Sequence, residues 1–300
     1  MTGIETSRGS EMVQSRDRPT RLAPANAEPQ HRRAHMTSDD LAALRSAVES
    51  LEHRSLAARL AEIAGRPIEL IGHALPAPAA EAIAKAISKG LGMALDVSLR
   101  SLHHTRQASS PLLHKTLAMV SGAAGGAFGL AALAIELPVS TIIMLRSIAD
   151  IARGEGEDLS DPETALACME VFALGGAAGS ADASESAYFA VRAMLAKSVT
   201  EAARFVAERG AVTEGAPVLV RFVTQVASRF GLVVNQKIAA QALPVVGALG
   251  GAAVNYAFVG HFQEVARGHF AVRRLERIYG SHLVRAEYAR ISGHHGKVAM

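Results

Sequence analysis

Residues 121–165 read SGAAGGAFGLAALAIELPVSTIIMLRSIADIARGEGEDLSDPETA, a small-residue segment followed by an amphipathic segment and an acidic turn. The first segment belongs to a run of twenty uncharged residues, 116–135. As a helix this run is about 30 Å long, roughly the thickness of a bilayer core. Few of its side chains are large and apolar, so its insertion into lipid would be only marginally favourable. We expect contact with a membrane and keep a tightly packed soluble core as the alternative.

Glycines four residues apart recur in three segments, VSGAAGGAFG, ALGGAAGSAD and VVGALGGAAV, which begin at residues 120, 173 and 245. Such spacing lets helix backbones approach closely. A glycine inside a helix costs up to about 1 kcal/mol relative to alanine, so it needs a structural reason. We therefore expect three helices to share a close contact through Gly122, Gly126, Gly129, Gly175, Gly179, Gly247 and Gly251.

Pro138 predicts a break or kink at Glu136–Leu137, because proline lacks the amide hydrogen and disfavours a helical conformation in the residue before it. Glu136 then has two interpretations. It is either a polar group that faces a channel, ligand or partner, or a carboxylate favoured near the start of the next helix. A second uncharged run, 238–260, contains Pro244. The two runs predict membrane-associated hairpins kinked near Pro138 and Pro244.

The chain has 300 residues, of which 49% are hydrophobic and only 4% aromatic, with no tryptophan. Apolar residues recur at helical spacing along most of its length. The predicted fold is all-α, a multi-helix bundle of eight to ten helices with closely packed glycine-rich segments. Residues 1–37 lack periodicity and predict a disordered tail, residues 38–285 form the helical domain, and residues 286–300 form a C-terminal tail.

Positive charge is concentrated at the C-terminal end, where residues 261–300 hold seven lysines and arginines against three acidic residues. A basic segment suits an anionic lipid surface. We expect four arginines on the helix that runs on from His261 to face lipid, with a solvated face as the alternative: Arg267, Arg273, Arg274 and Arg277. Basic and aromatic residues do not interleave, which argues against nucleic acid as a partner.

Cys168 is the single cysteine, and its apolar flanks predict a buried thiol rather than a nucleophile. One cysteine fits a reducing compartment, and the first thirty residues contain no apolar core of a secretory signal. We expect the protein at the cytoplasmic face of a bacterial inner membrane, peripheral or partly inserted. The expected partners are membrane lipid, a transporter or other membrane protein, and a second copy of the chain.

The acidic turn, residues 154–163, carries five carboxylates within nine residues. It lacks the residue order of an EF-hand loop, and Glu155, Glu157 and Asp158 are its candidate metal ligands. The alternative is a turn that starts a helix, with Ser160 or Asp161 as the cap and Pro162 in the first turn. The sequence has no serine-hydrolase elbow, phosphate-binding loop, dinucleotide fingerprint or cysteine pair, so no catalytic or cofactor-binding residue is predicted.

Several stretches resemble the EcsC family of bacterial proteins, chiefly ELPVSTIIMLRSIADIARGEGEDLSDPE and LPVVGALGGAAVNYAFVGHFQEVARGHFAVRRLERIYG. The resemblance covers roughly residues 38–285. The family takes its name from a gene beside the two components of an ABC transporter, and the resemblance implies no particular reaction. The family pattern falls on Glu136, Pro138, Arg146, Asp150, Arg153, Glu155, Gly156, Glu157, Gly247, Gly251, Asn255, Arg273, Arg274 and Glu276.

Three hypotheses about function follow. The leading one is a non-enzymatic, membrane-associated helical protein that serves a transporter or an envelope process. The second is a soluble hydrolase-like or metal-dependent enzyme in which Glu136, Asp150 and the acidic turn converge on one pocket. The third is a soluble module that binds an apolar ligand between helices.

Overall fold

The computed structural model describes residues 35–53, 55–64, 77–101, 133–176, 186–209, 216–241 and 247–293. Within these ranges every regular element is helical, as the sequence predicts, and the nine α-helices fall within the expected eight to ten. The helices are α1 (Ser38–Val48), followed by a π-helical turn (Glu49–His53), α2 (Leu56–Ala64), α3 (Ala77–Ser101), α5 (Leu133–Gly154), α6 (Pro162–Leu174), α7 (Ala187–Arg209), α8 (Pro217–Gln241), α9 (Gly247–Tyr279) and α10 (Ser281–Ser292).

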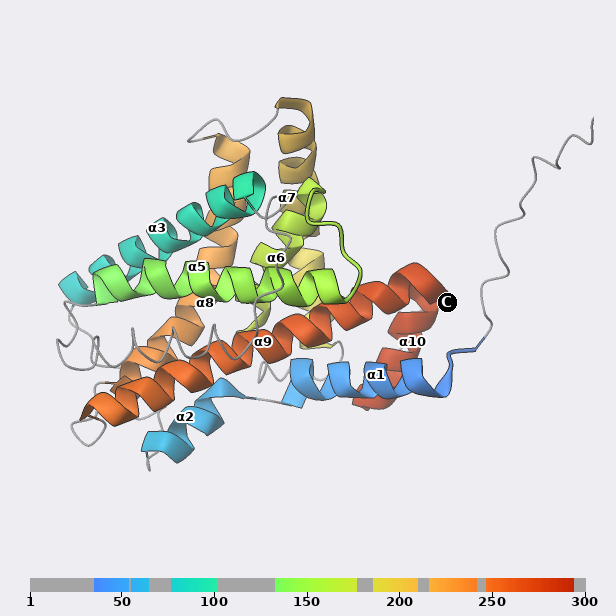
Figure 1. Cartoon of the computed structure of the whole chain (residues 1–300), viewed down its shortest axis with the longest axis horizontal. Helices are drawn as coiled ribbons and strands as arrows, with labels where there is room; N and C mark the ends of the chain where they lie inside the picture. The colour runs from blue at the N-terminus through green and yellow to red at the C-terminus, as the bar shows by residue number, and fades with distance from the viewer. Residues whose placement is uncertain are drawn as a thin grey trace, which may run out of the picture.

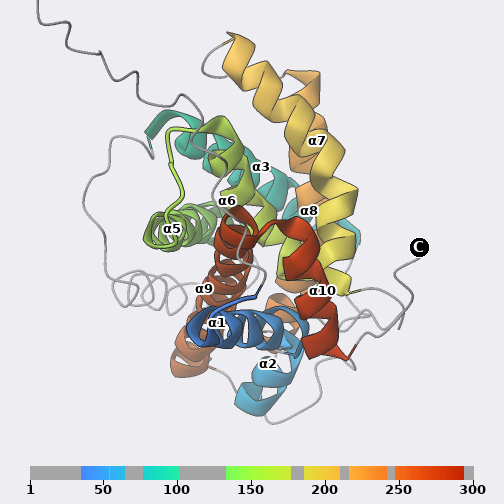
Figure 2. The ribbon, with the colours of Figure 1, turned by 90° about the vertical axis from the view of Figure 1, so that its right-hand side faces the viewer.

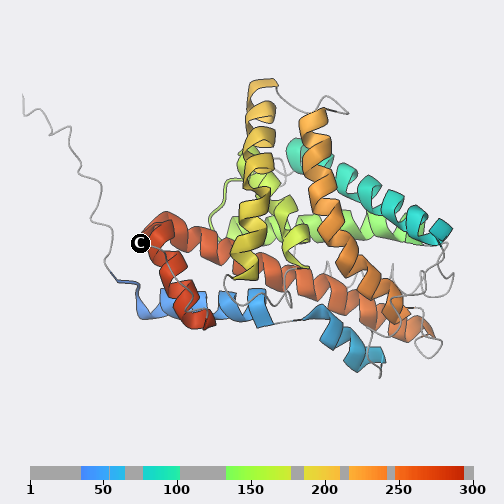
Figure 3. The ribbon, with the colours of Figure 1, turned by 180° about the vertical axis from the view of Figure 1, so that it is seen from behind.

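Helix α9 runs through the length of the molecule with α5 beside it and α1 and α2 along its other side (Figure 1). Seen from behind, α7 and α8 stand next to one another and α3 crosses α8 (Figure 3). The short helix α6 lies in the middle of these elements (Figure 2). Every residue of α6 from Thr164 to Leu174 is buried, so α6 is the central helix of the core.

Phenylalanines from three helices form the centre of the core. Phe172 of α6 lies 5.1 Å from Phe230 of α8, and Phe262 of α9 lies 5.5 Å from Phe230, measured between ring centroids. Both pairs meet edge to face, an arrangement worth about 0.5–1.5 kcal/mol beyond the apolar area that it buries. Phenylalanine rings therefore join α6, α8 and α9 at the centre of the core.

Side chains cap the starts of two helices, and the cap of α6 confirms the prediction made for the acidic turn. The Thr37 hydroxyl accepts a hydrogen bond from the Asp40 amide and caps α1. The Asp161 carboxylate accepts from the Glu163 amide and caps α6, with Pro162 as the first helical residue. Cys168 is fully buried in α6, as its flanks predict.

Of the break or kink predicted at Glu136–Leu137, the break is wrong, because α5 runs from Leu133 to Gly154 with Pro138 inside it. The hydroxyl of Thr141 donates to the Leu137 carbonyl at 2.7 Å. The Pro138 backbone also lies against Gly90 of α3, where an added Cβ would come 3.1 Å from the Pro138 Cα. Packing against α3 therefore holds the helix together where local propensity favours a break.

The uncharged run 238–260 is divided between α8, which is described up to Gln241, and α9, which is described from Gly247, so Pro244 lies outside the described residues. Helix α9 continues without interruption from Gly247 to Tyr279. The C-terminal boundary needs correction. Residues 286–292 are not a tail: they belong to α10, which buries Tyr288 against Tyr188 of α7 at a ring distance of 5.7 Å.

Candidate functional site

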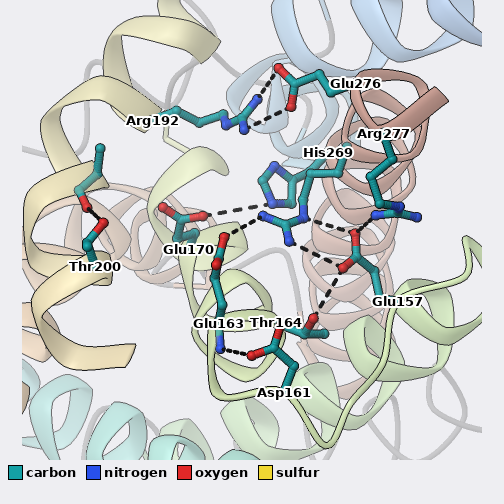
Figure 4. A network of polar contacts seen from close by, with 12 residues as sticks. Glu157, Asp161, Glu163, Thr164, Glu170, Arg192, Thr200, His269, Glu276 and Arg277 are labelled. Atoms are coloured by element: carbon teal, nitrogen blue, oxygen red, sulfur yellow. Dashed lines mark hydrogen bonds and ion pairs between the residues drawn. The ribbon is translucent and has the colours of Figure 1, made fainter. Parts of the chain in front are cut away.

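The acidic turn is bound to α9 by arginines, a set of contacts that we call the arginine clamp (Glu155, Glu157, Arg273, Arg274 and Arg277). Arg273 donates two hydrogen bonds to Glu157, at 2.9 and 3.2 Å, and Arg277 contacts the same carboxylate (Figure 4). Burial opposes ionisation of Glu157, but the hydrogen bonds and charges of Arg273 and Arg277 outweigh it and lower the pKa of this carboxyl. Glu157 is therefore an ionised anchor.

The clamp also reaches the first helix. Arg274 bridges Glu155, at 2.8 Å, and Asp40 of α1, at 3.0 Å. The Tyr279 hydroxyl donates to Asp40 at 2.6 Å, and this bond, with those from Thr37 and Arg274, lowers the pKa of Asp40 against the opposing effect of burial. The acidic turn, α1 and the end of α9 are thus joined by charged pairs.

This geometry bears on the candidate metal ligands. Glu155 and Glu157 point at arginines, and the Asp158 carboxylate accepts from the amide and hydroxyl of Ser160, at 2.9 and 2.7 Å, which closes the turn. In the part of the chain that the structure describes, no three His, Cys, Asp or Glu side chains gather as a metal site would need. The positive φ of Gly156, 79°, explains why a glycine occupies this turn.

The clamp changes the interpretation of the four arginines expected to face lipid. Arg273 and Arg274 direct their guanidinium groups at carboxylates of the same chain, and Arg277 contacts Glu157 while its side chain stays partly exposed. Arg267 is exposed on α9. Sequence reasoning found the basic residues but missed their partners, because a charge alone does not tell which distant carboxylate it meets.

A second chain of polar contacts, which the sequence did not predict, lies near the clamp, and Figure 4 shows its Arg192–Glu276 and His269–Glu170 pairs. Arg192 of α7 makes a bidentate pair with Glu276, at 3.0 and 3.1 Å, and donates to the Tyr188 hydroxyl at 3.3 Å. That hydroxyl lies 3.1 Å from Nδ1 of His269, whose Nε2 lies 4.0 Å from the Glu170 carboxylate of α6. The chain therefore links α7, α9 and α6.

Burial shifts the pKa values of two groups in this chain, Glu170 and His269. It raises the pKa of Glu170 to about 7, against the pull of Arg192 and Arg273. Burial, together with the charges of the same two arginines, lowers the pKa of His269 well below its usual value. At neutral pH the imidazole is therefore uncharged, and Glu170 keeps its proton to a higher pH than an exposed carboxyl does. All three side chains, Glu170, Tyr188 and His269, are buried, so the chain can hold a proton but offers no surface to a substrate.

Glu136 pairs with Lys237 of α8, Nζ to Oε1 at 2.6 Å, and both side chains are buried. The Lys237 ammonium also lies 5.0 Å from the centre of the Phe258 ring. Burial lowers the pKa of Lys237, while the charge and hydrogen bond of Glu136 oppose that change. Glu136 is thus a partner of another helix, and its second oxygen finds no hydrogen-bond partner among the described residues.

The carboxylates of the enzyme hypothesis lie apart. Glu136 and Asp150 are fourteen residues apart on α5, which separates them by about 21 Å along the helix axis. Asp150 accepts a hydrogen bond from Arg153 at 3.0 Å, and Arg146 is exposed. The glutamates of the acidic turn bind arginines of α9. Glu136, Asp150 and the acidic turn therefore do not converge on one pocket.

The predicted glycine contacts divide into three cases. Gly122, Gly126, Gly129 and Gly179 lie outside the described residues. Gly175, at the end of α6, lies against Phe262 of α9, and its carbonyl accepts a hydrogen bond from His261 Nε2 at 2.8 Å. Gly247 begins α9, and Gly251 and Asn255 are buried within it.

A cavity of about 570 Å³ lies between α3 and α8. This volume falls within the range of about 300–1,000 Å³ that is typical of small-molecule sites. Among its lining residues, Met93 and Val220 are 43% and 52% exposed. Of the described helices, α8 is long and apolar enough to cross a membrane, with a mean hydropathy of 1.3, yet only 33% of its apolar window is buried. The sequence did not predict this cavity, because it depends on two helices more than a hundred residues apart.

Comparison with curated proteins finds no match, and neither does comparison with solved structures. A family model does match, over residues 38–275, which cover α1 to nearly the end of α9. The matched range includes every residue of the arginine clamp except Arg277, which lies two residues beyond its end. The chain belongs to the EcsC protein family.

Proposed function

We propose that this protein is a peripheral membrane protein that contacts lipid through α3 and α8. The observation that carries the proposal is that α8 has the length and hydropathy of a membrane helix but is poorly buried. Val220 and Leu232 of α8 are 52% and 56% exposed. Large apolar side chains left exposed on a long apolar helix are typical of surfaces that meet a partner or a membrane.

The other side of α8 argues that the helix lies on the membrane rather than across it. Phe222 and Phe230 are fully buried in the core, and Lys237 is held by Glu136. If α8 crossed a bilayer by itself, these contacts would be lost and a charged lysine would enter hydrocarbon, which costs several kcal/mol. A helix that packs with one side and exposes the other suits the interface.

The cytoplasmic face of a bacterial inner membrane is the proposed place. There the anionic leaflet would attract lysines and arginines near the apolar side chains, such as Lys89 on α3. A transporter or other membrane protein would be a neighbour at that surface. Cell fractionation tests the location: the protein should appear in the membrane fraction and leave it in alkaline carbonate, and a wholly soluble pool would contradict the proposal.

Vesicle pelleting tests the surface itself. The full chain should co-sediment with vesicles that contain phosphatidylglycerol, and Met93→Glu should weaken the affinity for the vesicles about tenfold, the effect of roughly 1.4 kcal/mol. Met194→Glu on α7 is the matched control, because Met194 is 44% exposed and does not line the cavity. Equal losses in the two variants, or no pelleting of the unaltered protein, would overturn the proposal.

A further inference from the structure

We infer that the cavity between α3 and α8 holds one acyl chain of a fatty acid, with the carboxylate of the ligand at Lys89. The inference rests on the proposed contact with lipid, since a membrane is the source of such a chain. Six apolar side chains line the cavity, Met93, Leu95, Val97, Leu219, Val220 and Val223. On α3 the lining extends from residue 88 to residue 97, about 13 Å of helix axis, so the cavity is elongated along the helix.

Gly92 leaves room for a ligand beside α3. It lies inside α3, where glycine is about 1 kcal/mol less favourable than alanine. Close packing does not explain it, because a Cβ added at Gly92 would meet nothing within 4 Å. Gly90, two residues earlier, differs: its added Cβ would come 3.1 Å from the Pro138 Cα. Gly90 lets α3 approach α5, whereas Gly92 lies on the exposed side of the lining and leaves that side of the cavity open.

Among the described residues that line the cavity, Lys89 is the charged group that remains to bind a ligand. Asp96 pairs with Arg100 on the same helix, and the Thr224 hydroxyl donates to the Val220 carbonyl at 2.8 Å. Lys89 is exposed, and no described carboxylate lies within ion-pair distance of its ammonium group. A single free cation beside an apolar cavity complements a ligand with one apolar chain and one negative head.

Palmitate and hexadecanol test this assignment, because the two probes share a chain and differ in the charge of the head. With delipidated full-length protein, calorimetry or displacement of a fluorescent fatty acid should show palmitate binding about tenfold more tightly than hexadecanol, a difference of roughly 1.4 kcal/mol. Lys89→Met should abolish that difference and leave hexadecanol binding unchanged. Lys197→Met, which alters an exposed lysine of α7, is the control and should change neither.

Substitutions that fill the cavity provide a second test of the inference. Gly92→Leu should abolish binding of both probes, and Gly92→Ala should weaken it, while circular dichroism shows unchanged helicity. Equal affinity of the unaltered protein for the two probes, or full palmitate binding by folded Gly92→Leu protein, would overturn the inference. If the protein pellets with vesicles but does not bind palmitate, this inference alone fails. If it binds palmitate but does not pellet with vesicles, the proposed function alone fails.

Discussion

Lys237 and Glu136 form a buried ion pair that joins α8 to α5 across 101 residues of sequence. The contribution of this pair to the stability of the fold depends on both partners being present, because each charge offsets the cost of burying the other. We therefore predict that Glu136→Leu and Lys237→Met each lower the free energy of unfolding by about 3–5 kcal/mol. Urea denaturation followed by circular dichroism measures the change.

The double variant Glu136→Leu/Lys237→Met sharpens this prediction. With both charges gone, no unpaired charge is left at this position, and the stability should return to within about 1–2 kcal/mol of the unaltered protein. If the losses of the two single variants simply added in the double variant, the pair would not be coupled.

Much of the helix pattern could be predicted from the sequence, because local signals decide where helices start. The Asp161 cap followed by Pro162 is such a signal, and so are the apolar neighbours of Cys168. The continuity of α5 through Pro138 could not be predicted, since it depends on the approach of α3 at Gly90.

The same limit applies to the candidate sites. The charges of the acidic turn and of α9 were visible in the sequence, but their pairing was not, because the two segments lie 116 residues apart at the Glu157–Arg273 contact. Lys237 was visible only as the end of an uncharged run. Family resemblance marked Glu136, Glu157 and Arg273 without assigning roles, and the structure supplies their partners.

Glu170 should make stability depend on pH. Burial raises its pKa from 4.5 to about 7, so the folded protein binds more protons than the unfolded chain between these values. Stability should therefore fall by about 3 kcal/mol as pH rises from 4.5 through 7. Glu170→Gln should remove this loss and be more stable than the unaltered protein at pH 8, as thermal unfolding across pH would show. Glu62→Gln, at an exposed position of α2, is the control. A pH dependence that persists unchanged in Glu170→Gln would contradict the assignment.

The arginine clamp predicts a contrast between buried and exposed ion pairs. Arg273→Met leaves the carboxylate of Glu157 without its bidentate partner and should destabilise the protein by about 2–4 kcal/mol. Arg290→Met removes a surface pair with Glu287 and should cost less than about 1 kcal/mol. Urea midpoints of the two variants measured side by side give the comparison, and equal midpoints would mean that the clamp does not stabilise the fold.

Two helical glycines should respond to alanine in opposite directions. At Gly92 a new Cβ meets open space, so Gly92→Ala should raise the free energy of unfolding by about 0.5–1 kcal/mol through the lower entropy of the unfolded chain. At Gly175 the φ is −57°, which any residue adopts, but a new Cβ would overlap the Phe262 ring in the centre of the core. Gly175→Ala should therefore lower stability by about 1–3 kcal/mol through overpacking. Because both substitutions add the same methyl group, a difference in sign between their urea midpoints isolates the space around each glycine. If both variants were stabilised, Phe262 would have room to move and Gly175 would not be a close contact between α6 and α9.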